Sequence, residues 1–255
     1  GGNTTNNFLS FNLSSIIGRE AYTWEIHKNF PGKDRMQAVV VGQSNGHQDC
    51  LYVFSGVSYD KDAEFTHEML YDVHEYDPHK KLWTQKKSIP NNGTPGVQGG
   101  YLAAAPAIKM GDSHVIIFGG AGGEQQHLNE RLRLGNVLKK LEHLANSDSL
   151  QNEIDQIKLK AKDLFKRTSF SRSIWAYHTI TDTWIEKGKL PNATQVVTEA
   201  ILWDTDIYIP GGEIRPGVRT NAITKLSMKP YEASFGWANY TTLIVYLVLM
   251  VLMGW

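Results

Sequence analysis

The sequence contains a single cysteine, Cys50, among its 255 residues. An intramolecular disulfide is therefore excluded, and this is compatible with either the cytosol or the bacterial periplasm. The sequence also lacks net charge, because 26 Lys and Arg residues balance 26 Asp and Glu residues. Without a basic patch, a nucleic-acid-binding protein is not indicated. The His residues are scattered and lack partners at metal-ligand spacing, so we expect no metal site.

Glycine pairs end short apolar segments at several places in the chain. They are Gly1-Gly2, Gly119-Gly120 and Gly211-Gly212, with Ser55-Gly56 as a degenerate case. Downstream of two of them an aromatic pair recurs with six residues between its members, Tyr76 with Trp83 and Tyr177 with Trp184. Glycine lets strands bend and approach closely, and the aromatic rings fill the space between sheets. This order is typical of a kelch blade, a four-stranded antiparallel sheet of a β-propeller.

The pattern predicts about three and a half blades. The segment up to Phe30 would supply three strands of one blade, with Phe11 and Trp24 in the aromatic positions. The strands predicted for the other blades are Gln37–Val41, Leu51–Phe54, Leu70–Tyr76, Leu82–Gln85, Leu102–Ile108, His114–Phe118, Ile174–Tyr177, Trp184–Glu186, Thr198–Trp203, Ile207–Ile209 and Ala222–Leu226. A closed propeller needs about four to eight blades. We therefore interpret residues 1–230 as part of an all-β, kelch-type propeller.

An insertion of different character splits the third blade. From about residue 125 to 170 the sequence has almost no Gly or Pro, and apolar residues recur at helical spacing. Asn146–Ser149 interrupts the pattern, so we predict a helical hairpin. It is either a decoration on the blade or a lid over the mouth of the propeller.

The C-terminal residues 231–255 lack charge after Tyr231-Glu232, and Leu243–Trp255 is almost entirely apolar. A membrane-spanning helix needs about twenty apolar residues. We interpret the segment as a linker and the beginning of a transmembrane helix, with Trp237 and Tyr240 at the interface. The alternative is a buried core helix, for which a propeller has little room.

An acid and a base flank a Pro-Gly turn after the apolar strand Ile207–Ile209. They are Glu213 and Arg219, within the segment Gly211–Thr220. A Glu can transfer protons, and an Arg can bind a carboxylate through two parallel hydrogen bonds. An isolated pair of this kind is also a common surface ion pair, but its place on the exit loop of a blade favours a functional site.

Several segments resemble the N-acetylneuraminate epimerase (sialic acid mutarotase) family. They are Asn29–Gly32 with Arg35–Ala38, Leu51–Gly56, Asp72–Pro78 and Glu213–Thr220. The last is similar to the family's Gly-Glu-x-x-Pro-Gly-x-Arg-Thr motif, and the family also carries a largely helical insertion. Residues 1–24 resemble a blade moved along the chain, as in the cyclically permuted branch of the family. The C-terminal tail resembles the first helix of sodium:solute symporters.

The resemblance implies a sugar mutarotase with Glu213 as acid/base residue and Arg219 as the essential arginine. Arg35 would be a second substrate-binding cation near the mouth. The substrate would be a sialic acid, no cofactor is called for, and the propeller would lie on the periplasmic side of a membrane. Two alternatives remain: a non-catalytic sugar-binding propeller that presents substrate to a transporter, and a kelch protein-interaction module.

Overall fold

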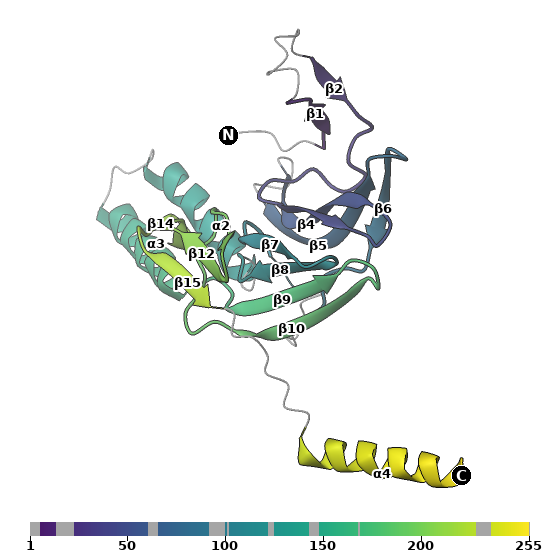
Figure 1. Ribbon diagram of the computed structural model, residues 1–255. Helices are drawn as coiled ribbons and strands as arrows, with labels where there is room; N and C mark the ends of the chain where they lie inside the picture. The colour runs from purple at the N-terminus through teal and green to yellow at the C-terminus, as the bar shows by residue number, and fades with distance from the viewer. Residues whose placement is uncertain are drawn as a thin grey trace.

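The computed structural model describes residues 6–13, 23–60, 66–91, 100, 102–121, 125–142, 148–167, 169–227 and 236–254. Most of the elements are strands in antiparallel sheets, and the helices lie outside them (Figure 1). The strands are β1 (Leu9–Phe11), β2 (Trp24–Ile26), β3 (Val39–Ser44), β4 (Asp49–Asp60), β5 (Thr66–Asp77), β6 (Leu82–Lys86), β7 (Ala107–Met110), β8 (His114–Phe118), β9 (Ser173–His178), β10 (Thr183–Lys189), β11 (Ile201–Trp203), β12 (Asp206–Pro210), β13 (Glu213–Arg215), β14 (Val218–Arg219) and β15 (Ile223–Ser227).

Two sheets have the four-stranded order predicted for complete blades. One runs β3-β4-β5-β6 and the other β7-β8-β9-β10, with every neighbouring pair antiparallel. A third sheet has the order β11-β12-β15, and a small hairpin, β13-β14, lies between its second and third strands in sequence. The first strands of the two complete sheets approach one another, because β3 packs beside β7. The prediction of repeated antiparallel sheets is confirmed.

The aromatic pairs are cross-strand neighbours. Tyr76 faces Trp83 with ring centroids 5.0 Å apart, and Tyr177 faces Trp184 at 4.8 Å. The rings of Tyr177 and Trp184 pack on Phe54 of the preceding sheet at 5.4 and 5.7 Å. These rings belong to the core between the two complete sheets. The six-residue spacing between Tyr and Trp therefore marks aromatic residues that pack one sheet against the next.

The first strand of the second complete sheet is shorter than predicted. The sequence predicts a strand over Leu102–Ile108, whereas β7 begins at Ala107. Before it, Ala103 forms an isolated bridge with Ala121, and Ala104 has φ = 55°. A positive φ interrupts the alternation of a strand, so the apolar residues of this segment belong to a turn rather than to the sheet.

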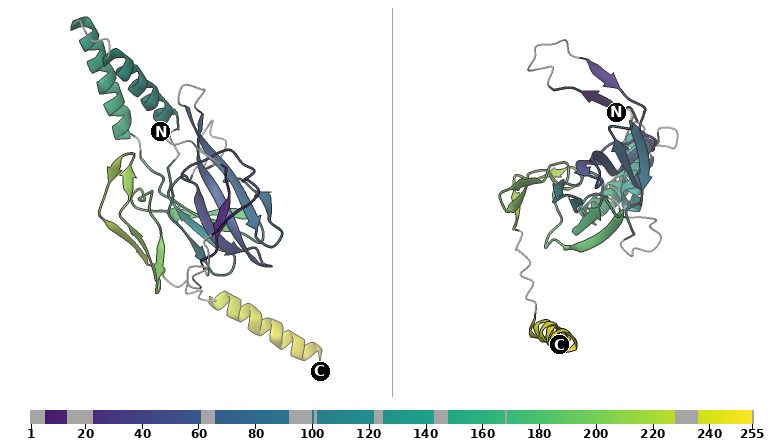
Figure 2. Two further views of the ribbon diagram at one scale, coloured as in Figure 1. Left: turned by 90° about the horizontal axis from the view of Figure 1, so that it is seen from above. Right: turned by 45° about the vertical axis from the view of Figure 1, so that its right-hand side comes forward.

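The predicted helical hairpin is present. Helix α2 covers Gln125–Glu142 and α3 covers Asp148–Arg167. The two helices pack against each other, with Leu134 and Ile154 buried, and α2 also contacts β5. Figure 2 shows the hairpin projecting past one end of the sheets. Helix α2 ends at Glu142 and α3 begins at Asp148, so Asp148 and Ser149 of the predicted break belong to α3, and Asn146 and Ser147 lie outside the described residues.

The N-terminal segment contributes two described strands, β1 and β2, where three were predicted. Phe11 and Trp24, the residues assigned to the aromatic positions, are register partners with ring centroids 5.1 Å apart. Phe8 packs against Tyr76 and Trp83 of the next sheet at 4.6 and 5.1 Å. Gly1-Gly2 and the rest of the predicted three-stranded unit lie outside the described residues.

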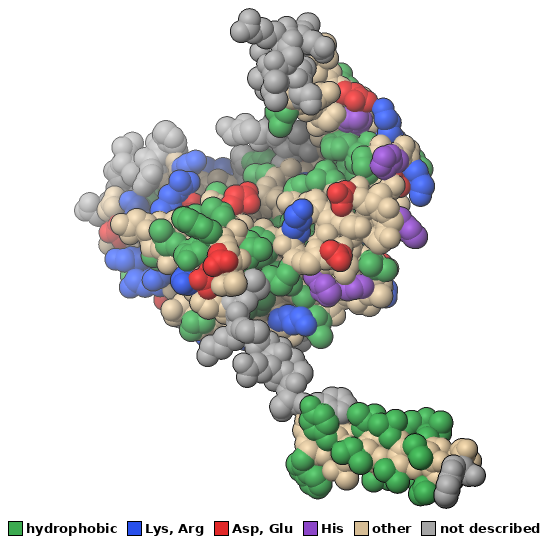
Figure 3. Space-filling view, viewed as in Figure 1, with side chains coloured by type: hydrophobic (Ala, Val, Ile, Leu, Met, Phe, Trp, Pro, Cys, Tyr) green, Lys and Arg blue, Asp and Glu red, His purple; other side chains and the backbone are tan. Residues whose placement is uncertain are grey.

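Helix α4 covers Trp237–Met253 and none of its residues is buried. Figure 3 shows it standing apart from the sheets, with hydrophobic side chains over much of its visible surface. The alternative of a buried core helix is therefore wrong for these residues. Within the described ranges, no helix has both the length and the apolar character needed to cross a membrane.

Candidate functional site

The same end of each sheet carries an insertion after its glycine pair. Ser55-Gly56, Gly119-Gly120 and Gly211-Gly212 all have positive φ angles, between 55° and 117°. The residues that follow them form equivalent isolated bridges, Met36 with Val57, Ala103 with Ala121, and Val196 with Glu213. The insertions are the long ends of β4 and β5, the α2–α3 hairpin and the β13–β14 hairpin. Glu213 therefore lies at the same end of the molecule as the helical insertion.

Glu213 and Arg219 lie opposite each other in the β13–β14 hairpin. They are register partners, and Arg219 Nε lies 3.8 Å from Glu213 Oε1. Glu213 Oε2 accepts a hydrogen bond from the Gly217 backbone N–H at 3.2 Å, which fixes the turn. The Arg219 side chain is 77% exposed and that of Glu213 is 20% exposed. The turn thus brings the predicted acid and base together and leaves the guanidinium open to a ligand.

The backbone of Glu213 is held rigidly. Its N–H donates to Val196 O and its carbonyl accepts from Val196 N–H, both at 2.9 Å. Gly212, with φ = 90°, makes this approach feasible, since a Cβ there would lie 2.5 Å from Val196 O. The side chain of Gln195, which is 3% exposed, donates to Ala222 O and accepts from the Thr224 hydroxyl, so it ties the base of the hairpin to β15.

Arg35, the predicted second cation, is bound to a carboxylate of the protein. Its Nη1 and Nη2 donate to the two carboxylate oxygens of Asp72 at 2.8 and 2.7 Å. Nη1 also donates to Ser55 O, Nε donates to Lys33 O, and the guanidinium lies 4.4 Å from the Phe30 ring centroid. With a side chain only 6% exposed, Arg35 holds the glycine-pair end of β4 to β5, a contact that the sequence interpretation did not include.

His74 completes this cluster and was also missed. Its Nε2 lies 2.9 Å from Asp72 Oδ2, whereas its buried Nδ1 has no hydrogen-bond partner among the described residues. Burial raises the pKa of the Asp72 carboxyl, but hydrogen bonds from His74 and Arg35 outweigh it and hold that pKa well below its usual range. Asp72 and His74 are two apart on β5 and so share one face of the strand, which is the signal that could have identified them.

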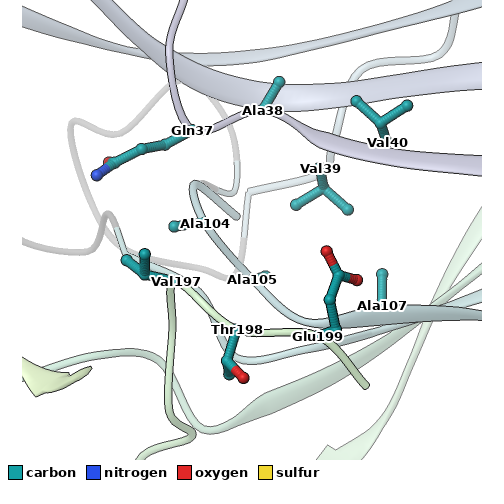
Figure 4. Close-up of a pocket in the computed structure, with 10 residues that line it drawn as sticks. All are labelled: Gln37, Ala38, Val39, Val40, Ala104, Ala105, Ala107, Val197, Thr198 and Glu199. Carbon is teal, nitrogen blue, oxygen red and sulfur yellow. The ribbon is translucent and has the colours of Figure 1, made fainter. Parts of the chain in front are cut away.

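A groove of about 420 Å³ lies where the segments that lead into the first strands of the three sheets meet. It is lined by Gln37, Ala38, Val39, Val40, Ala104, Ala105, Ala107, Val197, Thr198 and Glu199 (Figure 4). Gln37, Ala104 and Val197 occupy equivalent positions, with φ of 57°, 55° and 57°. Ala104 N–H donates to Gln37 O at 2.7 Å and Val197 N–H donates to Ala104 O at 2.9 Å. This hydrogen-bonded ladder links the three sheets along one wall of the groove.

Gln37 and Glu199 supply the free polar side chains of the groove. Among the described residues, neither side chain takes part in a hydrogen bond or an ion pair, whereas the Thr198 hydroxyl donates to Pro210 O at 2.6 Å. In the same described part of the chain, no three His, Cys, Asp or Glu side chains lie close enough to hold a metal ion. The polar groups described at this end include the Glu213 and Glu199 carboxylates, the Arg219 guanidinium and the Gln37 amide.

Known proteins match most of the chain. The sequence profile of the N-acetylneuraminate epimerase family matches residues 1–246. N-Acetylneuraminate epimerase from Salmonella paratyphi B is 28% identical over 200 residues, which cover 78% of this chain and 46% of that protein. The Yersinia enterocolitica protein of the same name is 26% identical over 207 residues, covering 78% and 45%. The chain thus spans about half the length of the curated relatives it matches.

A solved structure shares the fold. The structure of YjhT superposes with a TM-score of 0.60 at 18% sequence identity, covering 90% of this chain and 60% of that one. At this identity the likeness concerns the fold alone.

Proposed function

Because this chain belongs to the N-acetylneuraminate epimerase family, we propose that it forms part of a sugar mutarotase that interconverts the anomers of N-acetylneuraminate. The observation that supports this most directly is the facing pair Glu213 and Arg219. It combines a proton-transfer group, most of it shielded from solvent, with an exposed cation that suits the carboxylate of a sugar acid.

The reaction opens the sugar ring and closes it on the other face. The Glu213 carboxylate accepts the proton of the anomeric hydroxyl while the bond between the anomeric carbon and the ring oxygen breaks. The ring oxygen takes up a proton from solvent, and an open-chain keto acid results, with the anomeric proton held on Glu213 until the ring closes. Rotation about the adjacent carbon–carbon bond then presents the other face of the carbonyl, and the reverse steps close the ring. Throughout, the Arg219 guanidinium binds the sugar carboxylate and fixes the position of the anomeric carbon.

The rate acceleration that this reaction needs is within the range of general acid–base catalysis by one carboxylate. General acid–base catalysis contributes about a hundred- to ten-thousand-fold, and mutarotation in water already proceeds without an enzyme. Each step is a proton transfer and the breaking or forming of one carbon–oxygen bond, so the proposal includes no cofactor. Arg35 enters it only indirectly, because its guanidinium is bound to Asp72.

The test compares two substitutions by NMR, following the approach of purified α-N-acetylneuraminate to anomeric equilibrium. Glu213→Gln should lower the catalysed rate at least about a hundred-fold and leave the affinity for the sugar acid largely intact. Arg219→Ala should weaken binding itself, because the carboxylate loses its partner. Unchanged mutarotation in Glu213→Gln would remove the acid/base role and leave a sugar-binding propeller as the better description.

The proposal extends to the cell membrane. The exposed apolar surface of α4 supports attachment of the propeller to a lipid bilayer, on its periplasmic side and next to a symporter-like region. The packing of Phe8 on Tyr76 and Trp83 supports the N-terminal segment as a displaced part of a neighbouring blade. Fractionation of cells expressing the chain with and without residues 237–253 tests the attachment. Equal recovery in the soluble fraction would contradict it.

A further inference from the structure

The groove where the three sheets meet has polar groups on two sides and a floor of small side chains. Figure 4 shows the Gln37 amide at one side, the Glu199 carboxylate near Val39 and Ala107 on the other, and Ala104 and Ala105 between them. Apolar walls with a few polar groups at fixed positions are typical of small-ligand sites, and about 420 Å³ lies within the usual range for such sites. The groove thus suits a small molecule with both hydroxyl groups and apolar carbon–hydrogen faces.

The groove adjoins the backbone of Glu213 through Val196 and Val197. Val196 forms two backbone hydrogen bonds with Glu213, and the next residue, Val197, already lines the groove. Glu199 is three residues beyond Val196. Because Val197 has φ = 57°, the chain bends between these two residues, and Glu199 lines the same groove as Val197.

We propose that this groove holds the hydroxyl-bearing side chain of the sugar acid, with Gln37 and Glu199 as specificity-determining residues. The inference rests on the proposed function and assigns its substrate an orientation. The sugar carboxylate lies at Arg219, the anomeric carbon at Glu213, and the polyol side chain extends toward Glu199. At its far end, the Glu199 carboxylate accepts hydrogen bonds from hydroxyl groups, and on the opposite side of the groove the Gln37 amide both donates and accepts.

The charges select this orientation over the reverse one. Arg219 is the cation of the facing pair, and Glu199 is an exposed carboxylate without an ion-pair partner in the described part of the chain. A sugar acid bound the other way round would place its carboxylate against that of Glu199, and the repulsion would reject it. An uncharged open-chain polyol would lack the attraction at Arg219. The arrangement therefore favours ligands that are acidic at one end and hydroxylated at the other.

The test uses the full chain with two substrates, N-acetylneuraminate and an analogue from which the hydroxyl-bearing side chain has been oxidatively shortened. Glu199→Ala should raise KM for N-acetylneuraminate about ten-fold, the effect of losing a hydrogen bond to a charged group, and should change KM for the shortened analogue by less than about two-fold. Gln37→Ala should act in the same direction. Glu186→Gln on β10 removes an exposed carboxylate outside the groove and serves as the matched control.

The outcomes separate this inference from the proposed function. A loss of discrimination between the two substrates in Glu199→Ala, with an unchanged thermal midpoint, supports the groove as the side-chain subsite. Equal changes for both substrates, or no change for either, overturn it even if mutarotation is catalysed. If the unsubstituted chain accelerates the mutarotation of neither substrate, the proposed function fails. In that case, the affinities of the unsubstituted chain and of Glu199→Ala for the same two sugars are measured by calorimetry. A loss of affinity confined to N-acetylneuraminate supports the groove as the side-chain subsite, and equal changes overturn it.

Discussion

Arg35 and Asp72 form a two-pronged ion pair between the segment before β3 and the third strand of the same sheet, with N–O distances of 2.8 and 2.7 Å. The Arg35 side chain is 6% exposed and that of Asp72 is 23% exposed. Removing one member of a buried pair leaves the other charge without compensation, which is more costly than the pair itself is stabilising. The glycine-pair end of this sheet therefore depends on both residues.

Asp72→Asn should lower the free energy of unfolding on the order of 3 kcal/mol at pH 7. The pKa of Asp72 is lower in the folded chain than in the unfolded chain, so its stabilisation is fully present above the ordinary carboxyl pKa. It is lost as pH falls below about 4. Urea unfolding between pH 3 and 7 measures this. The difference between the two proteins should shrink toward the acid end, and a constant difference would contradict the assignment.

Arg35→Gln tests whether the two residues act as a unit. If Arg35 serves mainly to hold Asp72, the double variant with Asp72→Asn should be about as stable as either single variant, because the second change removes an interaction already lost. Lys33→Gln, which removes an exposed neighbouring cation, is the control. Additive losses in the thermodynamic cycle would show that Arg35 and Asp72 contribute independently.

Gly212→Ala should disrupt the site through the backbone. A Cβ at this position would meet Val196 O at 2.5 Å, and φ = 90° is unfavourable for alanine. The positive φ alone costs about 1–3 kcal/mol, and the clash would displace Glu213 from its bridge to Val196. Gly42→Ala is the matched control, because a Cβ there has no neighbour within 4 Å. Gly212→Ala should lower both the free energy of unfolding measured in urea and the mutarotation rate, whereas Gly42→Ala should leave both close to those of the unsubstituted chain.

Replacing residues 125–167 by a short Gly-Ser linker tests the role of the helical hairpin. The hairpin leaves its sheet at the same end as Glu213 and packs on β5 through α2. We expect the sheets to remain folded and KM for the sugar acid to rise several-fold, which corresponds to roughly 1 kcal/mol of lost binding free energy. An unchanged KM would identify the hairpin as a decoration and remove the lid interpretation.

Features that depend on neighbours in sequence were predictable. The Tyr76–Trp83 and Tyr177–Trp184 pairs, the glycine pairs and the helical insertion all follow from local periodicity. The contact between Arg35 and Asp72 does not, because it joins residues 37 apart in the sequence and follows no repeat. Gln37 and Glu199 were missed for a related reason: they lie on short segments that meet only when the sheets assemble.

The ladder of Gln37, Ala104 and Val197 joins three sheets through main-chain atoms alone. The three residues share a left-handed backbone conformation that is unfavourable for side chains with a Cβ, and yet they carry an amide, a methyl group and an isopropyl group at equivalent positions. Under the proposed subsite, substitutions at these positions would change the groove lining while the main-chain hydrogen bonds between the sheets are kept. The main-chain hydrogen bonds can thus be retained in related proteins whose groove-lining side chains differ.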